Sequence, residues 1–168
     1  MKKILMILAI AFAVIISVGA VSADDGWSFN WSSSSNSTSD GGQLDVNNNE
    51  VNIQDIKFVI PDEFKHNESA DAVGEEAGDN FPGCDISIVR FDNGDDSVII
   101  KVVYGDIKFD KDSYTPSNES VAQKIDKIDG FFKEYDDGVS FDYCKDGKLV
   151  EIFAPNQETL AKVIQSSE

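Results

Sequence analysis

The stretch "VSFDYCKDGKLVEIFAPNQETLAKVI", residues 139 to 164, decides the fold class, because a hairpin pattern runs directly into a helix pattern. The dipeptide Asp146-Gly147 favours a tight hairpin turn. That turn gives three apolar cross-strand pairs: Tyr143 with Val150, Phe141 with Ile152, and Val139 with Ala154. After Pro155 the spacing becomes helical, with Asn156 as the N-cap. The apolar stripe of this helix is Leu160, Val163 and Ile164, so we expect it to lie across a sheet.

The stretch "VNIQDIKFVIP", residues 51 to 61, predicts a second hairpin. A two-residue turn at Gln54-Asp55 sets Ile53 opposite Ile56 and Val51 opposite Phe58. All five apolar side chains, including Ile60, then share one face. Gln-Asp is a weak turn pair, so one longer strand with a bulge, which would restore the same alternation, is the alternative.

The stretch "CDISIVRFDNGDDSVIIKVVY", residues 84 to 104, predicts a third hairpin. A bare Asn93-Gly94 turn would mix apolar and polar residues on each face. A loop one residue longer instead gives these pairs: Ile88 with Ile100, Ile86 with Val102, Cys84 with Tyr104, and Ser87 with Lys101. We therefore expect the longer loop, since a register slip of one residue moves every side chain to the other face.

The remaining pattern completes an antiparallel sheet. "KIDKIDGFFKEY", residues 124 to 135, precedes the turn signal "DDG" and reads as part of a meander with the hairpin that follows. The fold class is therefore predicted as α+β, mainly an antiparallel sheet of hairpins and a meander, with the C-terminal helix packed on it. We expect one such domain over residues 50–168.

Residues 1–23 read as a secretory signal peptide. Lys2 and Lys3 precede an uncharged apolar run over residues 4–20, and the small residues "VSA" come before Asp24. The alternative is an uncleaved membrane anchor, because the run is at the lower limit of what spans a bilayer. We expect cleavage and an extracellular location, or a place on the outer face of the cell membrane. Membrane contact is expected only if the segment is not cleaved.

Residues 24–49 read as a disordered spacer rich in Ser, Asn, Asp and Gly, with almost no aliphatic side chain to bury. Trp27, Phe29 and Trp31 alternate within it and form a candidate adhesive patch, although local collapse without a partner is the alternative. The chain has four candidate N-glycosylation sites: Asn30, Asn36, Asn67 and Asn118.

The charge excludes some partners. The sequence has 14 Lys and Arg against 31 Asp and Glu, and removal of Lys2 and Lys3 leaves 12 against 31, a net charge of -19. Nucleic acid is therefore not expected as a partner, since its binding requires clustered positive charge. We expect a cell-wall or extracellular glycan or protein instead.

Catalytic patterns are sparse. His66 is the single histidine, so the chain cannot build a multi-histidine metal site or a histidine-based triad alone. No phosphate-binding loop or nucleophile elbow occurs, and no metal or other cofactor is indicated. A pair of carboxylates for glycoside hydrolysis remains open, because any two of the 31 acids could meet in the fold.

Cys84 and Cys144 are the two cysteines, and secretion would allow a disulfide between them. The expected registers place Cys84 on the face of Ile86, and Cys144 on the face opposite Tyr143, so the two would meet only at strand ends. A bridge would close a loop of roughly 60 residues and contribute about 4 kcal/mol. The alternative is two separate thiols.

At "IKFVIPDEF" and "GKLVEIFAPNQETLAKVI" the chain resembles a group of small secreted proteins of methanogenic archaea. The resemblance covers about half of residues 50–168 and implies a signal peptide, a spacer and a strand-rich domain, with no residue role to transfer. A strand closing in Pro-x-x-Phe is also similar to the opening of PsbP-like sandwiches, which implies non-catalytic binding.

These observations predict a secreted or cell-envelope-associated interaction module that is not an enzyme. The first alternative is a small extracellular binding domain for a sugar, a peptide or a cation. The second is a secreted hydrolase that uses a carboxylate pair.

Overall fold

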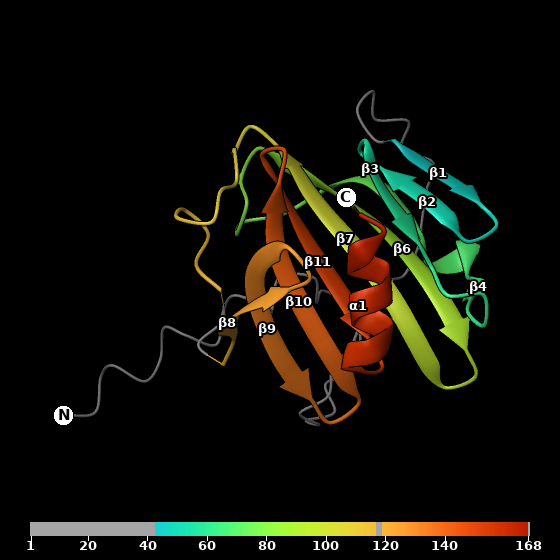
Figure 1. Ribbon diagram of the computed structural model, residues 1–168. Coiled ribbons are helices and arrows are strands. Elements are labelled where there is room, and N and C mark those ends of the chain that lie inside the picture. The colour runs from blue at the N-terminus through green and yellow to red at the C-terminus, as the bar shows by residue number, and fades with distance from the viewer. Residues whose placement is uncertain (1–42, 117–118, 168) are drawn as a thin grey trace, which may run out of the picture.

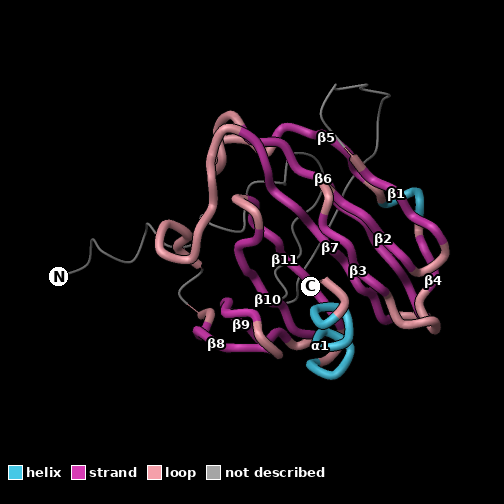
Figure 2. Tube along the Cα trace, turned by 45° about the horizontal axis from the view of Figure 1, so that its top comes forward, coloured by secondary structure: helices cyan, strands magenta, loops and turns pink. Residues whose placement is uncertain are grey.

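The computed structural model describes residues 43–116 and 119–167. These residues form a large and a small antiparallel sheet with one helix at the C-terminal end (Figures 1 and 2). The predicted class, a mainly antiparallel sheet with a C-terminal helix packed on it, is confirmed. Residues 1–23, read as a signal peptide, lie outside the described residues.

The small sheet has three strands in the order β1-β2-β3. Their bounds are β1 Leu44–Asn47, β2 Glu50–Ile53 and β3 Ile56–Val59. The predicted turn at Gln54-Asp55 is confirmed, with positive φ angles of 53° and 67° as a type I′ turn requires. Ile53 pairs with Ile56 and Val51 with Phe58, and all five apolar side chains of this hairpin are buried.

The large sheet has eight strands, with the main order β4-β6-β7-β11-β10-β9-β8 and β5 paired to β6. The first four bounds are β4 Lys65–His66, β5 Ala72–Glu76, β6 Cys84–Asn93 and β7 Asp96–Gly105. The other four are β8 Val121–Ile125, β9 Ile128–Tyr135, β10 Gly138–Lys145 and β11 Lys148–Ala154. The predicted register of the last hairpin is confirmed, with Tyr143 opposite Val150 and Phe141 opposite Ile152. A short 3₁₀ helix, Glu68–Ala70, follows β4.

The helix α1, Gln157–Gln165, begins where the sequence predicts. The Asn156 side chain accepts a hydrogen bond from the Thr159 backbone N–H at 2.9 Å, which satisfies one of the free donors of the first turn. The apolar stripe is fully buried: Leu160, Val163 and Ile164. The helix contacts β3, β10 and β11 and so bridges the two sheets.

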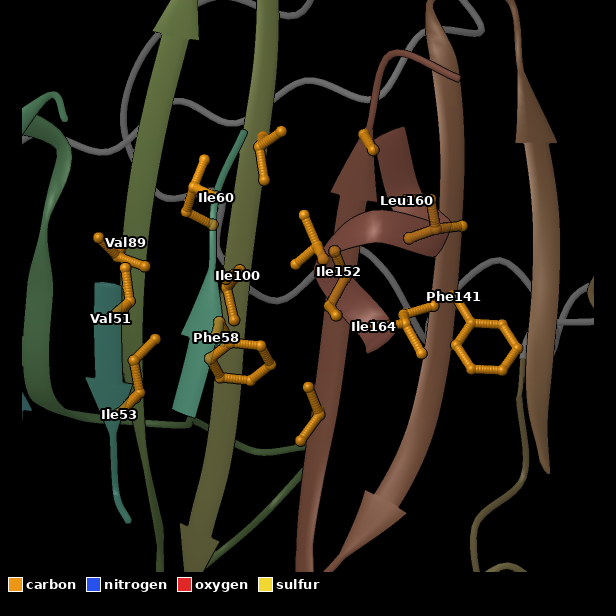
Figure 3. Packing of buried hydrophobic residues seen from close by; sticks show 14 of the residues in the cluster. Val51, Ile53, Phe58, Ile60, Val89, Ile100, Phe141, Ile152, Leu160 and Ile164 are labelled. Atoms are coloured by element: carbon orange, nitrogen blue, oxygen red, sulfur yellow. The ribbon is translucent and has the colours of Figure 1, made fainter. Parts of the chain in front are cut away.

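The large sheet is covered on both faces. On the first face, the small sheet and α1 pack into one apolar cluster, in which Phe58 and Leu160 meet side chains of the large sheet such as Ile100 and Ile152 (Figure 3). On the second face, a smaller cluster includes Ile86, Leu149 and Phe153. Its cover comes from residues of the connecting segments: Phe81, Ile107, Phe109 and Tyr114.

The predicted register of the hairpin over residues 84–104 is wrong. Asn93 pairs with Asp96, so the turn is at Gly94-Asp95, and the pairing is shifted by one residue from the expected one. The observed pairs include Ile88 with Lys101, Ser87 with Val102, Ile86 with Val103, and Cys84 with Gly105. Because both faces of β6 and β7 are largely buried, no single apolar face exists to fix the register.

One predicted boundary also needs correction. β1 lies inside residues 24–49, the predicted spacer, so the folded chain begins before residue 50. Leu44 and Val46 pack against the first-face cluster, and this apolar contact is the reason that the segment is ordered. β5 pairs with β6, with the buried Ala72 opposite Ile88.

Candidate functional site

An open groove of about 330 Å³ lies on the hairpin formed by β8 and β9. Its lining residues come from the two strands and from the segment that follows β7: Lys111, Ala122, Gln123, Lys124, Asp129, Gly130 and Phe131. The lining combines the apolar side chains of Ala122 and Phe131 with amide, carboxylate and ammonium groups. This combination of an apolar surface with a few polar groups is typical of binding sites.

β8 is the end strand of the large sheet (Figure 1). Within residues 43–116 and 119–167, no strand pairs with its outer edge. Val121 on this strand is 65% exposed and Ala122 is also exposed, whereas Ile125 is buried. The groove therefore lies beside an open strand edge, which is a common place for a second chain to bind.

Gly130 shapes the hairpin. A Cβ atom at this position would lie 2.4 Å from Phe141 Cζ and 2.5 Å from the Asp142 carbonyl oxygen. No side chain fits there, so glycine permits the close approach of β9 to β10. Figure 1 shows β9 curling strongly at the end that leads to β8. Gly130 also lines the groove.

A row of cross-strand neighbours leads from the groove into the sheet. In order across five strands, it consists of Ala122, Phe131, Asp142, Glu151 and Lys101. Cross-strand partners share one face of a sheet, so the row lies on the second face. Lys101 and Glu151 form an ion pair, and their side chains are mostly buried.

Asp142 is the least ordinary member of this row. Its side chain is buried, and Oδ2 accepts a hydrogen bond from the Tyr114 hydroxyl at 2.9 Å. Oδ1 has no hydrogen-bond partner among the described residues. Burial, followed by the neighbouring charge of Glu151, raises the pKa of Asp142 to about 8, although Tyr114, Lys101 and Lys133 act in the opposite direction.

The row explains why this carboxyl group keeps its proton. Two carboxyl groups and one ammonium group occupy neighbouring positions, and the ammonium of Lys101 contacts Glu151. Ionisation of Asp142 would add a second, poorly compensated negative charge in a buried place. Asp142 is therefore mainly neutral at pH 7.

Tyr114 connects Asp142 to the groove. Its ring centroid lies 5.8 Å from that of Phe131, which lines the groove, while its hydroxyl donates to Asp142. Burial, together with the charge of Asp142, raises the pKa of Tyr114 well above its ordinary value, so it remains a hydrogen-bond donor. Phe131 in the groove is thus supported by its ring contact with Tyr114, which is itself positioned by the hydrogen bond to Asp142.

Sequence reasoning missed Asp142. The correct register of the last hairpin already places it opposite Glu151, so the pair of acids was visible in the sequence. Its burial was not visible, because Tyr114 comes from a polar connecting segment with no strand or helix pattern. A buried acid in a strand can be recognised only when the cover of its face is known.

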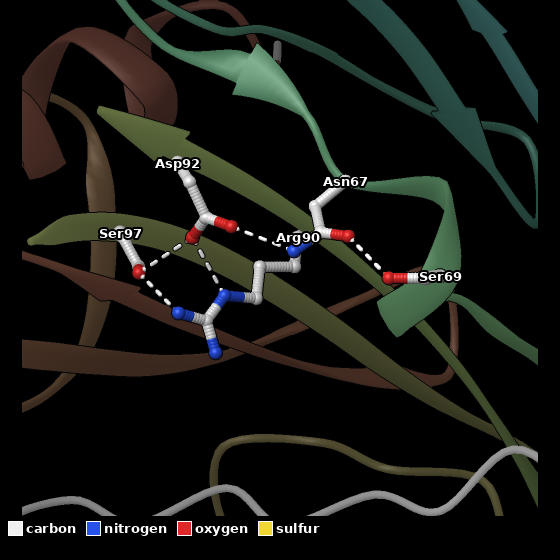
Figure 4. Close-up of polar contacts among 5 residues, drawn as sticks. All are labelled: Asn67, Ser69, Arg90, Asp92 and Ser97. Carbon is white, nitrogen blue, oxygen red and sulfur yellow. Dashed lines mark hydrogen bonds and ion pairs between the residues drawn. The ribbon is translucent and has the colours of Figure 1, made fainter. Parts of the chain in front are cut away.

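The candidate glycosylation site Asn67 belongs to a polar network on β6 and β7 (Figure 4). Its Nδ2 donates to Asp92 at 2.7 Å, and the Ser69 hydroxyl donates to Asn67 Oδ1 at 2.7 Å. Arg90 Nε also donates to Asp92 at 2.7 Å, and Ser97 donates at 2.8 Å. Burial opposes ionisation of Asp92, but these hydrogen bonds outweigh it and lower the pKa of Asp92. The Asn67 amide already has partners in the fold.

His66 is not an isolated surface histidine. Its ring stacks on Phe91 with centroids 5.0 Å apart, and Nε2 lies 2.9 Å from Asp71 Oδ2. Burial is the largest influence on Asp71 and raises its pKa, although the contact with His66 acts against this. His66 therefore joins β4 to the segment before β5.

Cys84 and Cys144 are free thiols, so the candidate disulfide is absent from the structure. Both belong to the second face, contrary to the expectation that they face opposite ways. Cys84 is on β6 and Cys144 on β10, with β7 and β11 between them. Three strand spacings correspond to about 14 Å, roughly twice the greatest Cα separation that a disulfide spans.

The other candidate residues lie outside the part of the chain that the structure describes. These are the aromatic residues Trp27, Phe29 and Trp31 and the glycosylation candidates Asn30, Asn36 and Asn118. In the described part, no helix is long and apolar enough to cross a membrane. The same part contains no group of three metal-ligating side chains placed to hold an ion.

Comparison with known proteins gives no match. No family model, no curated protein and no solved structure matches the chain.

Proposed function

We propose that the protein is a secreted or cell-envelope-associated interaction module that binds its partner through the groove on β8 and β9. The observation that carries this proposal is the position of the groove, which lies beside the unpaired edge of β8. An open surface of this kind suits an extended partner better than a small enclosed substrate.

The arrangement of the acids supports binding over hydrolysis. Asp142 and Glu151 are cross-strand neighbours, and the raised pKa of Asp142 suits the acid of a carboxylate-based hydrolase. Asp142 is only 2% exposed, however, and its Oδ2 already accepts a hydrogen bond from Tyr114. Burial and this hydrogen bond oppose access of a substrate to the carboxyl group, which favours a supporting role behind the groove over a catalytic one.

The proposed location rests on the sequence. Residues 1–23 have the charged start, apolar run and small-residue end of a signal peptide. The excess of acidic residues keeps copies of the protein apart unless a specific surface brings them together, and it disfavours nucleic acid as a partner.

Binding of the mature full chain to isolated cell walls tests the proposal. Ala122→Arg places a charged side chain in the groove, whereas Val59→Arg places one at the exposed end of β3. We expect Ala122→Arg to weaken binding several-fold and Val59→Arg to leave it unchanged. Equal binding by both variants would show that the groove is not the contact surface.

The nature of the wall partner is tested in the same assay. Walls treated with protease and walls oxidised with periodate separate a polypeptide partner from a glycan. Loss of binding after either treatment, together with sensitivity to Ala122→Arg, identifies the class of partner for this surface. Binding that survives both treatments and both variants would contradict an interaction through the groove.

A further inference from the structure

We propose that the groove and the free edge of β8 receive residues 27–31, "WSFNW", of a second copy of the chain. The segment would add as one more strand to the large sheet. This inference rests on the proposed function, because it names a partner for the same surface. It also gives a role to the aromatic residues Trp27, Phe29 and Trp31.

The edge of β8 is suited to strand addition. β8 has five residues, and among the described residues it is bonded to β9 on one side only. An added strand gains affinity from main-chain hydrogen bonds and specificity from alternate side chains. Ala122 and Phe131 are cross-strand partners and both line the groove, so they present the surface that such side chains would cover.

The segment has the matching pattern. In an extended conformation, Trp27, Phe29 and Trp31 point to one face, and Ser28 and Asn30 point to the other. The three aromatic rings on one side of the segment can pack on Phe131, while the polar residues on its other side remain in water. Three alternating aromatic residues beside an open apolar groove make a better fit than any other stretch outside the described residues.

Charge favours this segment as well. Residues 26–39 contain no Asp, Glu, Lys or Arg, although the chain as a whole has a net charge of -17. Two acidic copies repel each other over most of their surface. An uncharged segment can approach the groove without that repulsion. It also carries no positive charge that would repel Lys111 and Lys124, which line the groove.

The reach of the segment favours a second copy over the same molecule. Trp31 is 13 residues before Leu44, the first residue of β1 (44 − 31 = 13), and 13 residues extend to at most about 45 Å. The small sheet packs beside β6 and β7 on the first face, whereas the groove is on the second face. The path crosses five strand spacings from β6 to β8, about 24 Å, and passes around a layer about 10 Å thick.

Docking within one molecule would therefore need a largely extended connection around the edge of the sheet. Such stretching costs conformational entropy over many residues. A second copy has no such restriction. Because the donor segment and the acceptor groove are different surfaces, the contact is head-to-tail and can continue from copy to copy.

Tryptophan fluorescence tests the inference directly, since Trp27 and Trp31 are the two tryptophans of the sequence. The mature full chain is measured by emission and by sedimentation over the same concentration series. We expect the emission to move to shorter wavelength as the sedimentation coefficient rises, because both report the same contact. Ala122→Arg places a large charged side chain on an exposed position in the groove and retains both tryptophans.

We expect Ala122→Arg to abolish both concentration-dependent changes and Val59→Arg, the control at the distant β3, to retain them. Short-wavelength emission that does not depend on concentration would show docking within one molecule and overturn the inference. Long-wavelength emission at every concentration would also overturn it. If wild-type protein behaves in this last way but Ala122→Arg loses binding to cell walls, the proposed function stands and the second-copy inference alone fails.

Discussion

Asp142 shows how three neighbouring strands determine the protonation of one residue. The carboxyl group is buried, and Glu151 lies beside it. Burial, followed by the charge of Glu151, raises the pKa of Asp142 to about 8, compared with about 3.9 in an unfolded chain, although Lys101 acts against this. The folded state then binds more protons than the unfolded state between these two values, so the stability contributed by this group is full below about pH 4 and is lost as pH rises through about 8.

This reasoning predicts the effect of Asp142→Asn. The amide cannot ionise, and its oxygen can still accept the hydrogen bond from Tyr114. We expect the free energy of unfolding of wild-type protein to fall by up to a few kcal/mol between about pH 5 and pH 9, and that of the variant to fall less. Urea unfolding across this pH range measures both. Asp45→Asn, at an exposed position on β1, is the control that should follow the wild type. Parallel curves for wild type and Asp142→Asn would contradict the assignment.

At the scale of single elements, Gly130 allows β9 to approach β10 closely. A methyl group there would contact Phe141 Cζ at 2.4 Å and the Asp142 carbonyl at 2.5 Å, so the strands must move apart. We expect Gly130→Ala to destabilise the protein by about 1 to 3 kcal/mol, as overpacking usually does. Chemical denaturation measures the loss.

Gly94→Ala is the control variant for Gly130→Ala. The φ of Gly94 is +64°, but a Cβ atom would have no neighbour within 4 Å, so Gly94→Ala tests backbone strain without a clash. Strain of this kind costs about 1 to 2 kcal/mol. Gly130→Ala should also weaken binding to cell walls through the groove, whereas Gly94→Ala should not. A larger loss of wall binding in Gly94→Ala than in Gly130→Ala would show that binding does not depend on the shape of β9.

The start of α1 depends on one side chain. Asn156 Oδ1 accepts the hydrogen bond from the Thr159 N–H, and the helix then buries its stripe between the two sheets. Removal of this cap in Asn156→Ala should cost about 1 kcal/mol, while Asn156→Ser, which retains an acceptor, should cost little. Thermal or urea unfolding distinguishes the two variants. Equal losses would mean that packing alone determines where the helix begins.

At the scale of the whole molecule, local patterns predict the elements but not their arrangement. The turns at Gln54-Asp55 and Asp146-Gly147 were predicted correctly, since each depends on residues close in sequence and on one apolar face. The hairpin over residues 84–104 was predicted one residue out of register, because its strands have apolar residues on both faces. The order of strands in the sheet and the cover of its second face depend on contacts between distant segments, which periodicity does not encode.

The candidate site shows the same limit. The groove depends on Gly130, on the position of Lys111 in a connecting segment, and on the place of β8 at the end of the sheet. None of these produces a motif. The buried carboxyl group behind it became visible only when the aligned row of strands and the position of Tyr114 were known together.

The order of strands also determines the chemistry of the two cysteines. Cys84 and Cys144 are separated by two intervening strands, so neither local motion nor rotamer changes can join them. Cys84 is fully buried, and burial raises the pKa of Cys144 to about 11. Since the thiolate is the reactive form, both thiols should react slowly with an alkylating reagent in the folded protein.

Unfolding of the whole domain should expose both thiols together. We expect two thiols per chain to be titrated in denatured protein that has not been reduced, and slow alkylation of native protein that accelerates when denaturant reaches the unfolding midpoint. A reducing agent should leave that midpoint unchanged, because no covalent link restricts the unfolded chain. Fewer than two thiols in monomeric protein, or a midpoint lowered by reduction, would require a strand order in which β6 and β10 lie side by side.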